Sequence, residues 1–313
     1  MVVPVRTRAL TRSRRVALLK KDRQGVASTI GTIMALLVFL AFMSLIVNSY
    51  VPAWMLDNER SHMNKVMDQF GELKGKVDSM IAQERTTGDT SLNMYAPITV
   101  GSEGVPVFAT PTAGLISRVP QGVGTTGLNI QFSYATTTED IKVDVSGGGK
   151  IELYAPNRYY VQQWIAYENG AILIKQQDGQ TMRAFPNLDI SKNAGSINVG
   201  FTEVDIIGTN QSLTGSETVG FSLDLLYIDA QTYAAAGDKT WKMTMNTTYG
   251  AAWWRYFNDA LAGAGLVSGT DYVLTPALPV VASDDVVQIS LTLNNCGTIA
   301  YNRAYVSMTM LTS

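Results

Sequence analysis

The sequence has little of the chemistry on which most enzymes depend. Its 313 residues include one histidine, His62, and one cysteine, Cys296. A single cysteine rules out an intramolecular disulfide, and no histidine stands near it in sequence to activate the thiol. A lone histidine lacks the partners that a metal site needs. We therefore expect His62 to be solvated or packed on a helix, and Cys296 to be a buried structural thiol.

Charged residues are also scarce, at 16% of the chain, against ~25% in a typical soluble domain. No G-x-S-x-G, H-E-x-x-H or D-x-D-x-D-G motif is present, and the acidic residues of the C-terminal region are scattered. Asp284 and Asp285 stand side by side, where a calcium-stabilised loop is the alternative to a solvated acidic surface. We expect no catalytic residue, no metal site, no cofactor and no nucleic-acid partner.

What the sequence does contain is a long stretch without a charged side chain, residues 24–56. Its centre, residues 26–51, would form a helix of roughly 39 Å, which exceeds the ~30 Å hydrocarbon core of a bilayer. A secretory signal peptide has a shorter apolar region, of about 7 to 15 residues, followed by a small-residue cleavage site. The sequence after this run, VPAWMLDNE, has no such site. The stretch therefore predicts a membrane-spanning helix.

The charge on either side of this stretch predicts its orientation. Residues 1–25 carry eight Lys or Arg and one acid, a net charge of +7, whereas the remaining sixteen bases and twenty-five acids give −9. Basic flanks of a membrane helix stay in the cytoplasm. We expect a single-pass protein with a cytoplasmic N-terminus and an extracellular C-terminal domain. The sequons at Asn210 and Asn246 would then be accessible to N-glycosylation.

The junction between the basic and the apolar region reads KKDRQGVASTIGTIMALL, residues 20–37. It combines a basic cluster, a small residue and a hydrophobic helix that begins with Gly, Ser and Thr. This pattern resembles the class III signal sequence of archaeal type IV pilin-like proteins and archaellins, over about residues 20–51. The resemblance implies that a prepilin peptidase cuts after Gly25 and leaves Val26 as the new N-terminus. It also implies that a pilus assembly platform and other pilin subunits are partners.

In such a subunit the apolar helix first anchors the precursor in lipid and then packs in the core of a filament. Small residues such as Gly31 permit close approach of neighbouring helices. The positions expected to anchor and assemble the subunit are Ile30, Gly31, Ile33, Leu36, Leu37, Phe39, Leu40, Phe42, Leu45 and Ile46. The alternative is an uncleaved, permanently anchored surface protein whose outer domain binds a ligand or an envelope component.

The helical pattern continues beyond the apolar run into an amphipathic stalk, expected at residues 52–83. Its apolar positions alternate steps of three and four, at Met63, Val66, Phe70, Leu73, Val77 and Met80. This seam packs either on the chain's own outer domain, which we favour, or in a short coiled coil. Pro52 predicts a kink or break within residues 48–54. Asp57 and Glu59 are expected to mark where the chain enters water.

The pattern of residue types changes after the stalk. Residues 84–94 have no repeated apolar position and are expected to form a hinge. From residue 95 onward, about twelve short alternating runs rich in Val, Ile, Thr and Tyr predict an antiparallel sandwich or jelly-roll-like domain. Residues 249–266 have apolar side chains at helical spacing and predict one inserted helix that lies on the sheet. Trp253 and Trp254 raise the alternative of a carbohydrate platform, although amphipathic packing explains Trp253.

These features predict an α+β chain: a long, kinked, hydrophobic N-terminal helix followed by an antiparallel β-sandwich-like domain with one inserted helix. The expected parts are a basic leader (1–25), a transmembrane or filament-core helix (26–51), the stalk (52–83), the hinge (84–94) and a β-rich extracellular domain (95–313). The predicted function is that of a structural, pilin-like subunit of an archaeal cell-surface filament, whose outer domain contacts surfaces or neighbouring cells.

Overall fold

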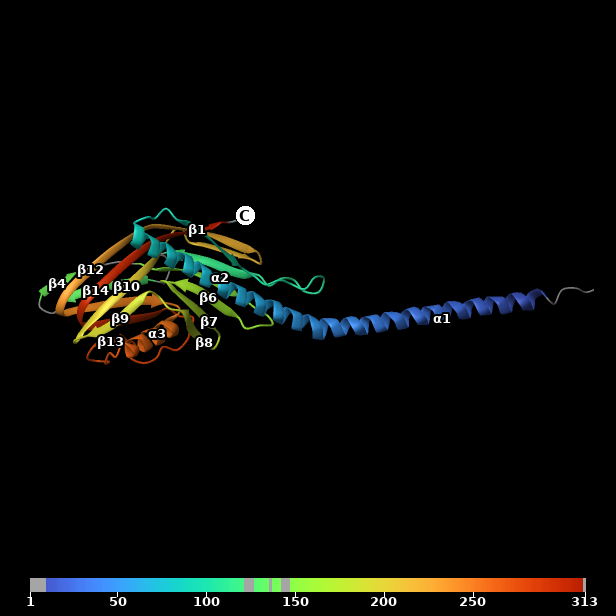
Figure 1. The fold of residues 1–313 in the computed structure, drawn as a ribbon. Helices are drawn as coiled ribbons and strands as arrows, with labels where there is room; N and C mark the ends of the chain where they lie inside the picture. Colours follow the sequence, from blue (N-terminus) through green and yellow to red (C-terminus); the bar gives the residue numbers. More distant parts are fainter. Residues whose placement is uncertain (1–9, 121–126, 135–136, 142–146, 312–313) are drawn as a thin grey trace, which may run out of the picture. The chain divides into compact units, whose positions relative to one another are not determined.

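The computed structural model describes residues 10–120, 127–134, 137–141 and 147–311 (Figure 1). The chain divides into two compact units, Met1–Trp54 and Met55–Ser313. Each unit is described by itself. Together they contain one long apolar N-terminal helix followed by mostly antiparallel sheets, so the predicted α+β class is confirmed.

The first unit is helical throughout its described part. Helix α1 spans Leu10–Leu45, a π-helical turn η1 spans Ile46–Tyr50, and α2 begins at Val51. Of the predicted kink or break within residues 48–54, the break does not occur, because the helix continues through Pro52 with the Val51 amide bonded to the Ile46 carbonyl, and the kink stays a prediction. Proline clashes with the carbonyl four residues earlier, and that residue, Asn48, lies in the π turn. The irregularity around Pro52 is therefore a change of helical hydrogen bonding.

Helix α2 (Val51–Thr87) forms the stalk of the second unit. The predicted intramolecular packing is confirmed, because the whole seam is buried in a core shared with the strands: Met63, Val66, Phe70, Leu73, Val77 and Met80. The helix ends at Thr87, four residues beyond the expected position, and Gly88 follows with a φ of 71°. The predicted hinge at 84–94 is therefore misplaced, since its start is helical and β1 begins at Asn93.

The strands form two sheets. The larger has the order β4 (Thr137–Ile141), β3 (Gly127–Tyr134), β12 (Thr218–Thr247), β14 (Val287–Leu311), β10 (Ser196–Ile207) and β9 (Leu188–Asn193), with β1 (Asn93–Thr99) beside β12 and β13 (Tyr272–Thr275) beside β14. The smaller has the order β11 (Gln211–Gly215), β2 (Gly114–Pro120), β5 (Gly149–Ala155), β6 (Gln163–Glu168), β7 (Ala171–Gln176) and β8 (Gly179–Ala184). Among these described pairs only β10 with β14 is parallel.

Two very long strands connect two hydrophobic cores. In β14 the side chains of Leu291, Leu293 and Ile299 belong to one core, whereas Ala304 and Val306 belong to the other. The N-terminal part of β14 therefore serves one core and its C-terminal part serves the other. Strand β12 likewise contributes to both cores and carries register shifts against β14. Sequence reasoning split each of these strands into two.

The smaller sheet is covered on both faces. Its Ile151, Leu153 and Ile165 face the core that contains α2, whereas Ala166 and Leu173 belong to the core of helix α3. Helix α3 spans Gly250–Gly263, within the predicted stretch, and Figure 1 shows it on a different side of the strands from α2.

Candidate functional site

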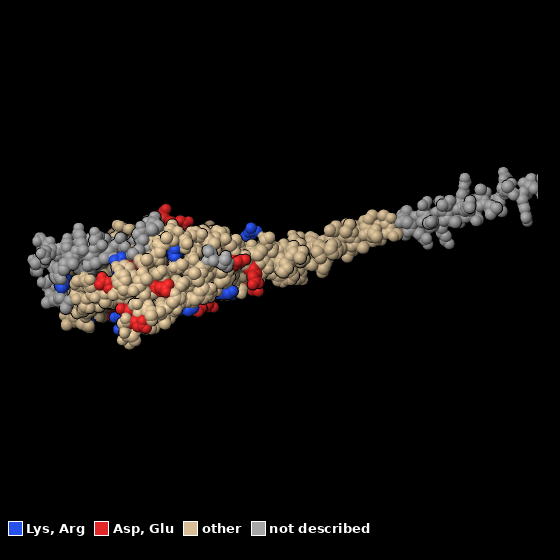
Figure 2. Space-filling view, turned by 90° about the horizontal axis from the view of Figure 1, so that it is seen from above, with Lys and Arg blue, Asp and Glu red and all other residues tan. Residues whose placement is uncertain are grey.

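The apolar helix is the feature most directly tied to function. Between Ser28 and Tyr50 it has no charged side chain. Figure 2 shows its described part in tan, with no blue or red side chain. Eight expected anchor positions are each 51–58% exposed: Ile30, Ile33, Leu36, Leu37, Phe39, Leu40, Phe42 and Leu45. Gly31 is also exposed, with nothing within 4 Å of an added Cβ, and Ile46 is half-buried. A helix apolar on every side requires lipid or other helices around it.

The expected processing site lies upstream of this surface. The backbone of Gly25 and Val26 lies inside α1, and their side chains fall outside the described set. The described helix from Ser28 onward is long and apolar enough to cross a membrane. The structure is consistent with single-pass anchoring, and cleavage after Gly25 stays a prediction.

Glu59 fixes the start of the stalk to the β domain. The expectation that it marks contact with water is wrong, because its side chain is completely buried, whereas Asp57 is exposed. The carboxylate accepts hydrogen bonds from three consecutive backbone amides, Arg158 at 3.0 Å, Tyr159 at 2.8 Å and Tyr160 at 2.7 Å. Thr112 Oγ1 donates a fourth, at 3.0 Å. A charged acceptor with this many donors ties two loops to one helix.

His62, one turn beyond Glu59, and Gln69, further along the same helix, both contact Thr99 at the end of β1. His62 Nε2 donates to the Thr99 carbonyl oxygen at 3.0 Å, because a carbonyl can only accept. Burial lowers the pKa of His62. Gln69 accepts from the Thr99 amide at 2.8 Å and donates to its hydroxyl at 3.2 Å. His62 is therefore packed on its helix, as predicted. Its role is to position β1.

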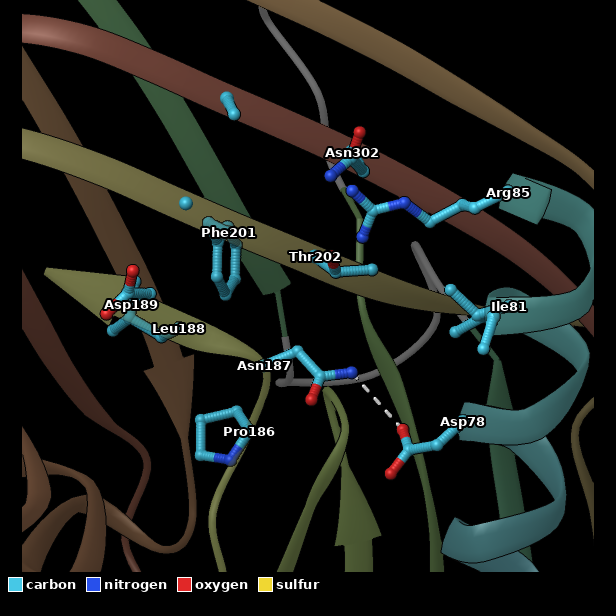
Figure 3. Close-up of a pocket in the computed structure, with 13 residues that line it drawn as sticks. Asp78, Ile81, Arg85, Pro186, Asn187, Leu188, Asp189, Phe201, Thr202 and Asn302 are labelled. Carbon is cyan, nitrogen blue, oxygen red and sulfur yellow. Dashed lines mark hydrogen bonds between the residues drawn. The ribbon is translucent and has the colours of Figure 1, made fainter.

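A groove of about 610 Å³ lies between the end of α2 and strands β9, β10 and β14 (Figure 3). Asp78 and Arg85 come from α2, and Asn187 Nδ2 donates to Asp78 Oδ1 at 3.3 Å. Lys74 also binds Asp78, at 2.8 Å. Apolar Ile81 completes the helix wall, and Figure 3 shows the Arg85 guanidinium pointing toward the strands. The described lining therefore combines carboxylates, a guanidinium and amides with apolar side chains.

A pair of buried carboxylic groups lies on β10. Tyr301 Oη donates to Glu203, and Arg303 Nε donates to Asp205, across the parallel β10–β14 ladder. Burial, followed by the negative charge of Asp205, raises the pKa of Glu203 well above its usual range. Gly147 packs directly on the pair, since an added Cβ would lie 1.7 Å from Glu203 Oε1. Both side chains are fully buried, and through Tyr301 and Arg303 the pair links two strands.

A second polar cluster lies between the smaller sheet and α3. Lys150 Nζ lies 2.8 Å from Glu152 Oε2, and the Tyr249 hydroxyl donates to the same oxygen at 2.6 Å. Trp253 Nε1 donates to Glu168 Oε1 at 3.1 Å. Burial raises the pKa of Glu168 from 4.5 to about 7. These residues cross-link the two layers.

The Glu168 carboxyl predicts a pH-dependent stability. Its folded-state pKa of about 7 exceeds the unfolded value of 4.5, so the folded protein binds the proton more tightly. The associated stabilisation is complete below pH 4.5, is lost as the pH rises toward 7 and stays lost above it. Glu168→Gln should flatten this dependence by about 3 kcal/mol. Denaturant unfolding of the full chain in detergent at pH 5 and pH 8 checks it, and an unchanged slope with pH in the variant would contradict it.

The burial of Trp253 decides between packing and a carbohydrate platform for the tryptophan pair. Trp253 is 1% exposed, and Trp254 donates to the Pro276 carbonyl at 2.8 Å, so amphipathic packing is confirmed and a paired tryptophan platform is wrong.

In the acidic loop, Asp284 forms an ion pair with Lys175 at 2.8 Å. Within the described residues no group of three potential metal ligands comes together. Cys296 is fully buried, as expected, and burial raises the pKa of its thiol to about 11.

The two sequons differ in accessibility. Asn210 is exposed in the connection between β10 and β11. Asn246 lies within β12, where its Oδ1 accepts a hydrogen bond from Gln288 at 3.2 Å. Asn210 is therefore the more accessible of the two acceptors, because Asn246 is half-buried within a paired strand.

Comparison with known proteins gives no relative: no family model, no curated protein and no solved structure matches this chain. The function therefore has to be argued from the residues themselves. Sequence reasoning missed Glu59, although a signal was present, because the three–four spacing of the seam extends backward from Met63 to position 59. It also missed Glu203 and Asp205, whose partners lie 98 positions away.

Proposed function

We propose that this chain is a structural, pilin-like subunit of an archaeal cell-surface filament, inserted in the membrane as a precursor and assembled through its apolar helix. One observation carries the proposal: the helix from Ser28 to Tyr50 is apolar and exposed on all sides, and it continues into a stalk whose seam is buried in a β domain. The stalk has no free apolar seam to offer a partner. We therefore assign helix–helix association between subunits to the apolar segment.

The mechanism is physical. In lipid, apolar side chains gain nothing from meeting one another, so helix association depends on close packing and small residues. Gly31, with open space around it, provides the site of closest approach. Cleavage after Gly25 by a prepilin peptidase would remove eight Lys or Arg from the cytoplasmic end. The assembly platform would then extract the shortened helix, whose end carries one α-ammonium group in place of eight Lys or Arg side chains and therefore leaves the membrane at lower cost.

Replacing Gly31 with leucine should separate the two roles of the helix. The variant keeps its hydrophobicity, so membrane insertion should be unchanged, whereas the bulkier side chain should lower the amount of assembled filament by about tenfold or more. Carbonate extraction measures insertion, and sedimentation and electron microscopy of sheared surface material measure assembly.

Val38→Leu is the matched control, because Val38 is 68% exposed in the same helix and the change also adds apolar volume. It should leave both readouts at the level of the unchanged protein. Equal assembly by the Gly31→Leu variant and this control would contradict helix packing through Gly31.

The second candidate is a permanently anchored surface protein whose β domain binds a ligand. The groove beside Arg85 and Asn302 favours it, because the groove is wide and has both polar and apolar walls. In that case the basic leader would be retained, and the Gly31→Leu variant would be as functional as the control.

A further inference from the structure

We propose that two loops at the start of the stalk form a lipid-contacting surface that seats the β domain on the membrane. The surface, called here the apolar rim, consists of Val107, Phe108, Tyr159 and Val161. The inference rests on the membrane-inserted precursor of the proposed function and requires neither cleavage nor filament assembly.

Both loops are fixed to the first turns of α2 within the second unit. Asn58 Nδ2 donates to the carbonyl oxygens of Glu103 at 3.2 Å and Gly104 at 3.4 Å, in the loop between β1 and β2. Glu59 binds the backbone of residues 158–160, between β5 and β6, as described above. Figure 1 shows the loop between β1 and β2 extending toward the N-terminal end of α2. The rim is thus held by rigid contacts at one end of the stalk.

The tip of the first loop displays an apolar side chain for which the domain offers no packing. The Phe108 amide donates to the Val105 carbonyl at 3.0 Å and closes a tight turn, in which Val107 has a φ of 71°. Glycine or asparagine usually occupies such a position, because a β-branched residue is strained there. Val107 is nevertheless 101% exposed, and Phe108 beside it is 41% exposed. The turn geometry disfavours valine, and the domain does not bury its side chain. Contact with lipid accounts for an apolar residue at this strained position.

The second loop presents the same chemistry. Tyr159 is 43% exposed and Val161 45% exposed, and Asn157 Nδ2 fixes the loop by donating to the Val161 carbonyl at 2.8 Å. Arg60 on α2 and Arg158 in this loop are also exposed. Aromatic and apolar side chains interspersed with arginine are suited to the boundary between lipid headgroups and acyl chains.

Chain connectivity identifies lipid as the partner. The segment expected to cross the membrane ends at residue 51, and Glu59 lies eight residues beyond it, about 12 Å along a helix. The contacts that hold both loops therefore belong to the first turns of chain after the membrane-spanning segment. The bilayer that holds this segment is thus a surface that every copy has close to these loops, and lipid is the partner that we propose for their exposed apolar side chains.

The test places a single environment-sensitive dye at chosen positions of the full chain, reconstituted at one copy per nanodisc of phosphatidylcholine and phosphatidylglycerol. Cysteines introduced as Val107→Cys and Val161→Cys carry the dye, and the native Cys296 is buried and does not compete. Lipids with a nitroxide near the headgroup should quench both positions by more than about twofold.

Two reference positions make the outcome decisive. Thr86→Cys, exposed at the far end of α2, should not be quenched, and Phe39→Cys in the apolar helix should be quenched by nitroxides deep in the bilayer. Quenching at position 39 with none at 107 and 161 would overturn the rim while leaving the anchor intact. Quenching at 107 and 161 that requires several copies per disc would assign the rim to contacts between copies and would also overturn it.

Discussion

Glu59→Ala is expected to lower the free energy of unfolding of the Met55–Ser313 unit by about 4 kcal/mol. The substitution removes the carboxylate at seam position 59 and leaves the amides of residues 158–160 and the Thr112 hydroxyl without their acceptor. Buried donors that lose a charged partner each cost about 1–3 kcal/mol. In a unit of this size the midpoint of thermal unfolding should fall by roughly 10 °C. Tryptophan fluorescence of the full chain in detergent measures it.

Glu72→Ala is the matched control for this prediction. Glu72 lies on the same helix, but its side chain is 53% exposed and forms an ion pair with Lys76 at 2.6 Å. Exposed pairs of this kind contribute about 0–1 kcal/mol. If both variants unfolded at the same temperature, Glu59 would not be what fixes the stalk to the two loops.

Phe70→Ala tests the packing of the stalk itself. Phe70 is completely buried in the core that α2 shares with the strands. Truncation of a buried phenylalanine leaves a cavity, and the expected cost is about 4 kcal/mol. Because the seam packs within one chain, this loss should not depend on protein concentration. Denaturant unfolding in detergent at two concentrations that differ tenfold measures both the cost and its independence.

Asp68→Ala, at an exposed position of the same helix, should change stability by less than about 0.5 kcal/mol. A Phe70→Ala chain that unfolds like this control, or one whose stability rises with concentration, would favour the coiled coil that the seam also allowed.

The sequence predicted these features to different extents because they depend on different ranges of the chain. The stalk seam could be found because three–four spacing is a local property, and its burial on the β domain followed from the absence of a longer heptad repeat. The same spacing includes position 59, but an acidic side chain there was read as solvent-exposed. Its donors in residues 158–160 lie about 100 positions away, so no local pattern could reveal them.

The long strands show the same limit. The run AAAGDK near Gly237 and the run NNCGT near Asn295 look like turns, yet β12 and β14 continue through them. β12 and β14 pair with each other on both sides of these runs, and the extra residues are taken up by register shifts between Ala234 and Lys239 and between Lys239 and Trp241. Tertiary pairing therefore overrode local turn signals. The parallel β10–β14 ladder, which brings Glu203 and Asp205 to Tyr301 and Arg303, depends on the same long-range pairing.

The apolar helix, by contrast, was read from composition alone, and its exposed surface follows directly from that composition. What composition cannot supply is the fate of the helix, because an anchor and a filament-core helix need the same apolar side chains. The difference lies in processing at Gly25 and in close packing at Gly31.

The most direct test of the central claim is N-terminal sequencing combined with the intact mass of the protein purified from native membranes. The account predicts a mature chain that begins at Val26. A chain that retains the basic residues 1–25 would contradict prepilin-type processing and would leave a single-pass anchor that displays a β domain.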